Sequence, residues 1–425
     1  MENNPRGIQF ANINQIPVLV DPSWIFIILF FALGIRQTYQ ELLPQWSWLI
    51  GFGVGILYFG SILLHELAHS LVAQRSGIKV NFVVLHFFGG LASLDREPPT
   101  AGIEARVAGA GPLINFLIGL ACLLLVYPIV GDNMLQLADA DGIKSLLVNR
   151  NSLAIAIAIV LYRVSALNLF VAVVNLLPGL PLDGGRLFRA LMWQISRNRY
   201  RGTVVAARSG QILGCFVISY GTLILFFLGS LGGLFFVLIG LMFFSQASQS
   251  LRLAEMQSAL MKVNAEITMT RDFRLVEGET TLRDFADHFL LQEQGKLKPI
   301  YFASSNGRDR GWIDPQKLSQ IKSDRWQQEL VELITTPLNS LTTVKLTSPL
   351  KEIITVLENG QLTWVAVLSP VGSVAGVIDR GDVVRALSKT LGWQLPEEFI
   401  QRIKQDGVFP PTLPLGAISA QLQEN

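Results

Sequence analysis

The chain has 425 residues, of which 50% are hydrophobic and only 16% are charged. Because soluble globular proteins carry about 25% charged residues, this composition excludes an ordinary soluble protein and predicts an integral membrane protein. A formal net charge of +2 gives no reason to expect nucleic acid among its partners. The hydrophobic excess ends near residue 251, which predicts a membrane domain over residues 1–250 and a soluble region after it.

Several apolar stretches approach the roughly 20 residues that a helix needs to cross a bilayer. The N-terminus lacks the residue order of a cleaved signal peptide, so we expect the first stretch to remain as an anchor. Between Asp183 and Arg208, six arginines accompany a single acid, and the positive-inside rule therefore places this connection in the cytoplasm. Counting from it predicts a multi-pass cell-membrane protein with both termini cytoplasmic. The six predicted spans are 22–33, 48–72, 107–130, 153–177, 210–228 and 231–244.

The second stretch contains a His-Glu-Leu-Ala-His motif at residues 65–69. Histidines four residues apart share one face of a helix, so His65 and His69 can bind one zinc ion while Glu66 acts as the base. The structural alternative is a satisfied polar cluster between helices, but ionisable groups at membrane depth are costly. The motif begins about ten residues before Arg75, or about 15 Å below the cytoplasmic surface. This pattern predicts zinc-dependent hydrolysis within the membrane.

Residues 80–94, which follow this span, are too short to cross the membrane. Their β-branched and aromatic residues around Gly89 and Gly90 predict a β-hairpin or a re-entrant element, which a membrane tolerates only beside a protein cavity. An exposed hairpin edge could hold an extended substrate by strand addition; a structural plug is the alternative. We expect His86, on this element, to have a structural role and not to bind metal.

A catalytic zinc site needs a third protein ligand, and Asp183 is the candidate. It follows Pro178 and Pro181, which break the fourth predicted span, and the topology brings it to the membrane face on which the histidines lie. The alternative is that Asp183 caps a helix that begins near Arg186. We favour a ligand role because no other residue at that depth can complete the site.

These motifs resemble the site-2 protease family of intramembrane zinc metalloproteases, peptidase family M50. The resemblance covers residues 16–191 and includes the segments 87–90 and 109–115 beside the motifs around Glu66 and Asp183. It implies that His65, His69 and Asp183 bind zinc, that Glu66 is catalytic, and that the substrates are single-span transmembrane proteins in the lipid bilayer. Four further residues are implied to support the substrate or the transition state: Asn115, Asn175, Gly89 and Gly90.

The soluble region begins with a predicted helical linker at residues 251–264 and then contains an internal repeat. Residues 298–314 align without a gap on residues 363–379, and each copy predicts a strand, a turn, a second strand and a helix. This doubled α/β unit resembles a tandem pair of CBS domains over residues 265–391. A tail of residues 392–425 follows, and we expect its part beyond Gly407 to be flexible or loosely docked.

The CBS resemblance raises the question of a bound adenine nucleotide. In that family a hydroxyl residue and an acid hold the nucleotide, but Asp314 and Asp379 replace the hydroxyl here and Lys317 replaces the first acid. Asp382 is then the one nucleotide-binding candidate, and the extra carboxylates would repel phosphates. Nucleotide binding and a purely structural role, including formation of a homodimer, both stay open.

The predicted fold is a polytopic α-helical membrane protein of about six transmembrane helices with a membrane-associated β-hairpin, followed by a cytoplasmic tandem CBS module. The predicted function is intramembrane zinc metalloendopeptidase, with one Zn²⁺ per chain, cleavage near the cytoplasmic face and a CBS module that regulates, senses or dimerises. An inactive client-binding relative is one alternative, which the intact Glu66 disfavours. A CBS-gated transporter or channel is another, but it would distribute ionisable residues along several helices.

Overall fold

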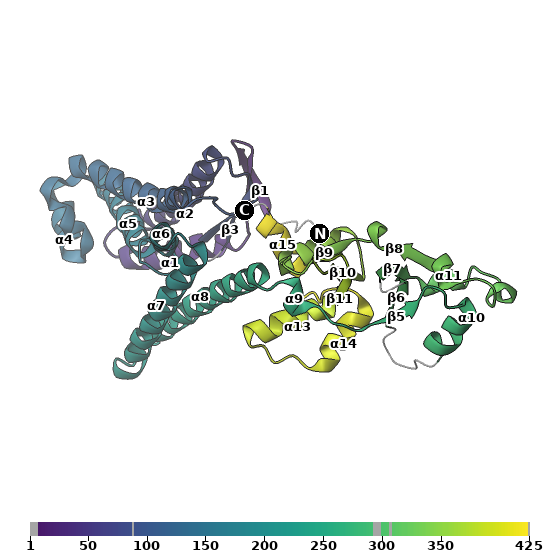
Figure 1. Ribbon diagram of the computed structural model, residues 1–425. Helices are drawn as coiled ribbons and strands as arrows, with labels where there is room; N and C mark the ends of the chain where they lie inside the picture. Colours follow the sequence, from purple (N-terminus) through teal and green to yellow (C-terminus); the bar gives the residue numbers. More distant parts are fainter. Residues whose placement is uncertain (1–6, 87–88, 292–298, 306–307, 424–425) are drawn as a thin grey trace. The chain divides into compact units, whose positions relative to one another are not determined.

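The computed structural model describes residues 7–86, 89–291, 299–305 and 308–423. The chain forms two compact units, Met1–Arg252 and Leu253–Asn425, which are described separately (Figure 1). Residues 87 and 88 of the family-like segment, and residues 298, 306 and 307 of the repeat, lie outside the described residues.

Long apolar helices dominate the first unit. By length and composition, five described helices can cross a membrane, so the predicted multi-pass fold is confirmed. The first predicted span is instead a shorter helix, α1 (Trp24–Tyr39), which packs against the next one. The predicted linker at 251–264 is largely the end of the last long helix. The five are α2 (Ser47–Arg75), α3 (Ala101–Val130), α5 (Ser152–Asn175), α7 (Arg199–Phe227) and α8 (Gly232–Lys262).

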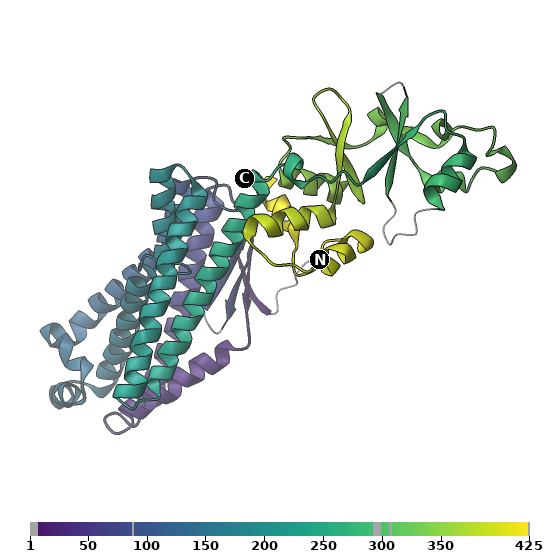
Figure 2. The same cartoon turned by 60° about the horizontal axis from the view of Figure 1, so that its bottom comes forward.

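Small residues bring the long helices close together. A Cβ at Gly119 of α3 would lie 2.7 Å from the Leu169 side chain of α5, and the Ser165 hydroxyl donates to the Gly119 carbonyl at 2.7 Å. A Cβ at Gly221 of α7 would lie 2.6 Å from the carbonyl oxygen of Gly233 in α8, and these two helices run side by side in Figure 2. Such close backbone approach is how helices associate within a membrane.

A four-stranded sheet accompanies these helices, with the strand order β1-β2-β3-β4. The predicted hairpin is its β3–β4 pair, and β2 runs parallel to β3 while the other pairs are antiparallel. Strands β1 and β2 were not predicted from the sequence. Strand β4 pairs on one side only among the described strands, so its other edge is free. The strands are β1 (Ile8–Ile13), β2 (Ile16–Val20), β3 (Val80–His86) and β4 (Gly89–Leu94).

Shorter helices join the spans. Helix α6 (Asp183–Ser196) follows the turn that contains Pro178 and Pro181, and it packs against α3 and α7. Its N-cap is Leu182, which makes no side-chain capping bond. Asp183 therefore lies inside the first turn of α6, and the predicted alternative of an Asp183 cap is wrong. A 3₁₀ segment η1 (Gly131–Ala138) and helix α4 (Ala140–Asn149) join α3 to α5.

Two sheets of matching topology form the second unit, which confirms the predicted α/β module. In each copy a strand pairs in parallel with the next one, which then turns back as an antiparallel hairpin. The strands are β5 (Phe273–Glu277), β6 (Ile300–Ser305), β7 (Arg308–Ile313), β8 (Thr335–Pro337), β9 (Thr343–Lys345), β10 (Trp364–Leu368) and β11 (Val374–Asp379). The helices are α9 (Ala265–Thr268), α10 (Leu282–Phe285), η2 (Ala286–Leu290), α11 (Pro315–Leu318), η3 (Ser323–Arg325), η4 (Val331–Ile334), η5 (Leu338–Ser340), α12 (Leu350–Asn359) and α13 (Arg380–Leu391).

The tail is folded onto the second copy of the repeat. It forms α14 (Glu397–Asp406) and α15 (Leu415–Gln423). Ile403, Leu415 and Ile418 are buried in one hydrophobic core with the side chains of α12 and α13. The tail is therefore part of the packed core of this unit, and the expectation of a flexible or loosely docked end beyond Gly407 is wrong for the described residues.

Candidate metal centre

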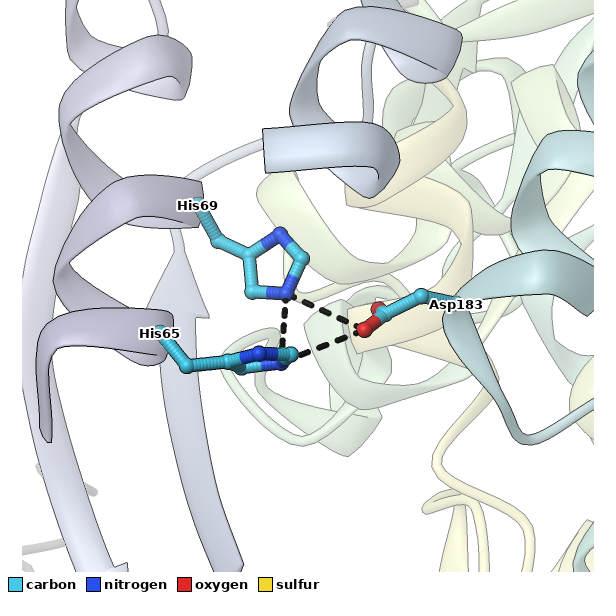
Figure 3. Close-up of side chains that lie close together, drawn as sticks. All are labelled: His65, His69 and Asp183. Carbon is cyan, nitrogen blue, oxygen red and sulfur yellow. Dashed lines mark hydrogen bonds and ion pairs between the residues drawn. The ribbon is translucent and has the colours of Figure 1, made fainter. Parts of the chain in front are cut away.

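Three predicted ligands meet between α2 and α6. His65 and His69, four residues apart on α2, point toward Asp183 in the first turn of α6 (Figure 3). The Oδ2 atom of Asp183 lies 3.2 Å from the Nε2 atom of each histidine, and the two Nε2 atoms are 3.0 Å apart. Residues far apart in the sequence thus present three ligand atoms to one point.

The hydrogen bonds of His69 fit metal binding. Its Nδ1–H donates to the carbonyl oxygen of Val107 in α3 at 2.6 Å, which leaves the Nε2 lone pair directed at Asp183 in the neutral ring. In a tetrahedral zinc site with bonds of about 2.0–2.1 Å, ligand atoms lie about 3.3 Å apart. The observed triangle matches that spacing, and both histidines are buried.

Gly111 of α3 provides the space for an ion. A Cβ built on it would lie 2.3 Å from Nε2 of His69 and 2.6 Å from Nε2 of His65. Any side chain at this position would therefore occupy the point where the ligand atoms converge. The two imidazoles, the carboxylate and this open space together fit a zinc ion.

Glu66 lies beside the ligands on α2, and β4 approaches its side chain. A Cβ on Gly90 would lie 2.1 Å from Cγ and 2.9 Å from Oε1 of Glu66. Only a residue without a side chain allows β4 to pass this close. Gly89, the neighbouring predicted residue, has a φ of +126°, a conformation that favours glycine. The structure therefore brings the predicted hairpin to the predicted base.

Among the described residues, no hydrogen bond joins either predicted asparagine to the three ligands. Asn115 is buried one turn beyond Gly111 on α3, and its Oδ1 has no hydrogen-bond partner among the described residues. Asn175 is the last residue of α5. His86 pairs with Gly89 in the sheet and does not belong to the ligand cluster found among the described residues. Sequence reasoning missed the Val107 carbonyl and the space at Gly111.

In the second unit, Asp382 is engaged by the chain itself. The Lys404 Nζ of α14 donates to Asp382 Oδ1 at 2.6 Å and to Asp379 Oδ2 at 2.8 Å. Asp379 also caps α13, because its Oδ1 accepts from the Asp382 N–H. Burial, followed by the neighbouring Asp379 charge, raises the pKa of Asp382 to about 6. Asp314 likewise caps α11, so both aspartates that replace a hydroxyl have a structural task.

Comparison with known families agrees with both halves of this description. Residues 54–218, which include the three ligands and Glu66, match the model of Peptidase family M50. Residues 331–389, which include the second copy of the repeat through most of α13, match the CBS domain model.

Similar proteins carry metalloprotease names. A candidate zinc metalloprotease of Synechocystis, sll0528, is 28% identical over 391 residues, covering 91% of this chain and 96% of that protein. A zinc metalloprotease of Methanocaldococcus jannaschii, MJ0392, is 26% identical and covers 90% of this chain and 96% of its own length. Among solved structures, the site-2 protease from Methanocaldococcus jannaschii is 27% identical over 58% of this chain and 95% of its own, with a TM-score of 0.39.

Proposed function

Because the chain carries a peptidase family M50 domain and is a zinc metalloprotease, we propose that it hydrolyses peptide bonds of single-span transmembrane proteins near the cytoplasmic face of the cell membrane. The observation that carries this proposal is the convergence of His65, His69 and Asp183 on the space at Gly111, directly beside Glu66. The metal ligands and a carboxylate base could thus act on the same peptide bond of a substrate.

His65, His69 and Asp183 would hold the zinc ion, and the Val107 carbonyl orients the His69 ring. Bound zinc supplies Lewis acidity, which polarises the scissile carbonyl and makes water a better nucleophile. The Glu66 carboxylate takes a proton from the attacking water and delivers it to the leaving amine. Gly90 leaves the Glu66 side chain room to do so.

The free edge of β4 is the proposed substrate-binding surface. An extended peptide segment can add to such an edge through backbone hydrogen bonds. Since Gly90 lies against Glu66, a peptide paired with β4 would run past the base. A transmembrane helix must unwind locally before it can pair in this way, because its own backbone groups are already hydrogen-bonded. Pairing with the edge of β4 would therefore select substrate segments that have unwound.

The cytoplasmic orientation and the role of the CBS module are further parts of the proposal. The arginines between residues 186 and 208 support a cytoplasmic location for α6, and both termini lie on that side. A nucleotide that used Asp382 would have to displace Lys404, so regulation through this module would involve α14. We also propose the module as the contact of a homodimer, which light scattering of the purified chain would test.

The decisive experiment is cleavage of a single-span model substrate in proteoliposomes, with zinc quantified in the same samples. Glu66→Gln should abolish cleavage and keep the metal, whereas His65→Ala should lose both. Cleavage that survives Glu66→Gln would refute the mechanism, and full zinc content in His65→Ala would refute the ligand set. The transporter alternative would predict flux without cleavage in the wild type.

A further inference from the structure

A buried ion pair joins α3 to α6 close to the metal centre. The carboxylate of Glu104 is fully buried on α3, and the Nε–H of Arg189 on α6 donates to its Oε1 at 2.5 Å. The Nη2 group of Arg189 reaches the same oxygen. The other oxygen, Oε2, has no partner among the described residues. Arg189 is therefore the main compensation for a charge held away from water.

The position of this pair relates it to two of the ligands. Val107, whose carbonyl accepts from His69, lies three residues after Glu104, which is one turn of α3. Arg189 lies six residues after Asp183 on α6, or about 9 Å along the helix axis. One turn of α3 thus makes two contacts. Its Val107 carbonyl holds the His69 ring, and its Glu104 carboxylate holds α6, the helix that carries Asp183.

The first turn of α6 also packs against the segment that precedes it, since a Cβ at Gly184 would lie 2.3 Å from the carbonyl of Leu176. Its N-cap makes no side-chain bond, and a turn with Pro178 and Pro181 precedes it. On the other side, α7 packs against the backbone of α6, since a Cβ at Gly202 would lie 2.7 Å from the Arg189 carbonyl oxygen. Arg189 is therefore one of the points at which α6 is held between α3 and α7.

We propose that Glu104 and Arg189 are positioning residues that hold Asp183 at the metal centre. Neither touches the ligand atoms, and both act through the placement of α6. This inference rests on the proposed zinc site, but the two can fail separately. If His65→Ala loses zinc while loss of the ion pair leaves the affinity unchanged, the site stands and the positioning role falls.

The rival explanation is that the pair only stabilises the fold. A stabilising role would lower the unfolding temperature of the metal-free protein and leave the metal affinity of the folded fraction unchanged. Cobalt separates the two explanations, because the visible absorption of bound Co²⁺ depends on the number and geometry of its ligands. A displaced Asp183 would change that spectrum.

The chain offers a matched control on another ion pair. Glu97, just before α3, pairs with Arg199 at the start of α7 at 2.5 Å. Its side chain is 44% exposed, against 0% for Glu104, and Arg199 lies beyond the end of α6. Glu97→Gln should therefore change neither the metal affinity nor the cobalt spectrum.

The test uses the full-length chain in detergent. Zinc affinity is measured by chelator competition for wild type, Glu104→Gln, Arg189→Gln, the double variant and Glu97→Gln, with the fold checked by circular dichroism. We expect Glu104→Gln and Arg189→Gln each to weaken zinc binding about 10- to 100-fold, which is the usual effect of removing a group that orients a metal ligand. Each should also alter the Co²⁺ spectrum. The double variant should bind zinc as tightly as the single variant with the lower zinc affinity, because both substitutions break the same ion pair.

Two results would overturn the proposal. One is a folded Glu104→Gln protein with wild-type zinc affinity and spectrum, and the other is an equal loss in Glu97→Gln. If Glu104→Gln does not fold, Arg189→Gln replaces it, because it removes the same ion pair from the α6 side. An unchanged zinc affinity in folded Arg189→Gln would then reject the positioning role, and a loss of about 10-fold or more would support it.

Discussion

Two glycines determine what the candidate site can hold. Gly111 faces the ligand nitrogens and Gly90 faces the base. The absence of a side chain leaves room for the metal at Gly111 and for the Glu66 side chain at Gly90. Both positions are sensitive to a single methyl group, but they affect different parts of the chemistry. Metal binding and proton transfer can therefore be separated by substitutions that add the same atom.

Gly111→Ala should remove the metal. Its Cβ would lie 2.3 Å from Nε2 of His69 and 2.6 Å from Nε2 of His65, so both rings must turn away from Asp183. We expect zinc content well below half of the wild-type value and no cleavage, measured by elemental analysis and the proteoliposome assay. Gly109→Ala on the same helix is the control, because its nearest neighbour is the Leu187 side chain at 3.8 Å. Full zinc content in Gly111→Ala would contradict this prediction.

Gly90→Ala should impair catalysis and spare the metal. Its Cβ would lie 2.1 Å from Cγ of Glu66, which forces the base aside, while His65, His69 and Asp183 keep their places. We expect at least a 100-fold lower cleavage rate, within the range that general-base catalysis contributes, with unchanged zinc. Gly60→Ala on α2, where nothing lies within 4 Å, should behave like wild type. Cleavage at the wild-type rate by Gly90→Ala would show that β4 does not confine Glu66.

At the scale of elements, the sequence predicts those whose signals are local. The α2 motif, the β3–β4 hairpin and the repeat follow from periodicity and spacing within short windows. The sequence does not predict strands β1 and β2, because their turn at Asn14 and Gln15 has positive φ values without the glycine that usually marks such a turn. The space at Gly111 and the Glu104–Arg189 pair depend on contacts between distant segments, which no local pattern encodes.

Asp382, buried beside Asp379, gives the second unit a pH-dependent contribution to stability. The pKa of Asp382 is raised from 3.8 to about 6, so this carboxyl stabilises the folded state fully below pH 3.8, and the contribution is lost as the pH rises through about 6. The Asp382→Asn variant lacks this titration. Relative to Asp382→Asn, wild type should therefore lose free energy of unfolding between pH 4 and pH 7. The loss should be at most about 1.4 kcal/mol for each unit by which folding raises the pKa.

Hydrogen exchange of α13 and α14 in the full-length protein, corrected for the intrinsic pH dependence of exchange, would measure that difference. The carboxylates of Asp382 and Asp379 share Lys404, so the Asp379→Asn variant provides a second comparison. A difference between wild type and Asp382→Asn that is flat over this pH range would show that Asp382 is already ionised below pH 4.

Across the whole molecule, the two units should respond differently to metal removal. The cluster of three ligands found among the described residues belongs to the first unit. Chelation with EDTA should increase hydrogen exchange in residues 60–75 and 183–190 and leave residues 344–391 unchanged, because ligands stabilise only the part that binds them. Adding zinc back should reverse the change. Equal loosening of both units would contradict this prediction.

The triangle of His65, His69 and Asp183 also discriminates between ions by size. Its edges of 3.0–3.2 Å suit cations with bonds of about 2.0–2.1 Å. Calcium requires six to eight oxygen ligands at about 2.3–2.6 Å, whereas this site offers two nitrogens. The centre should therefore exclude calcium even at high concentration and accept small divalent transition metals.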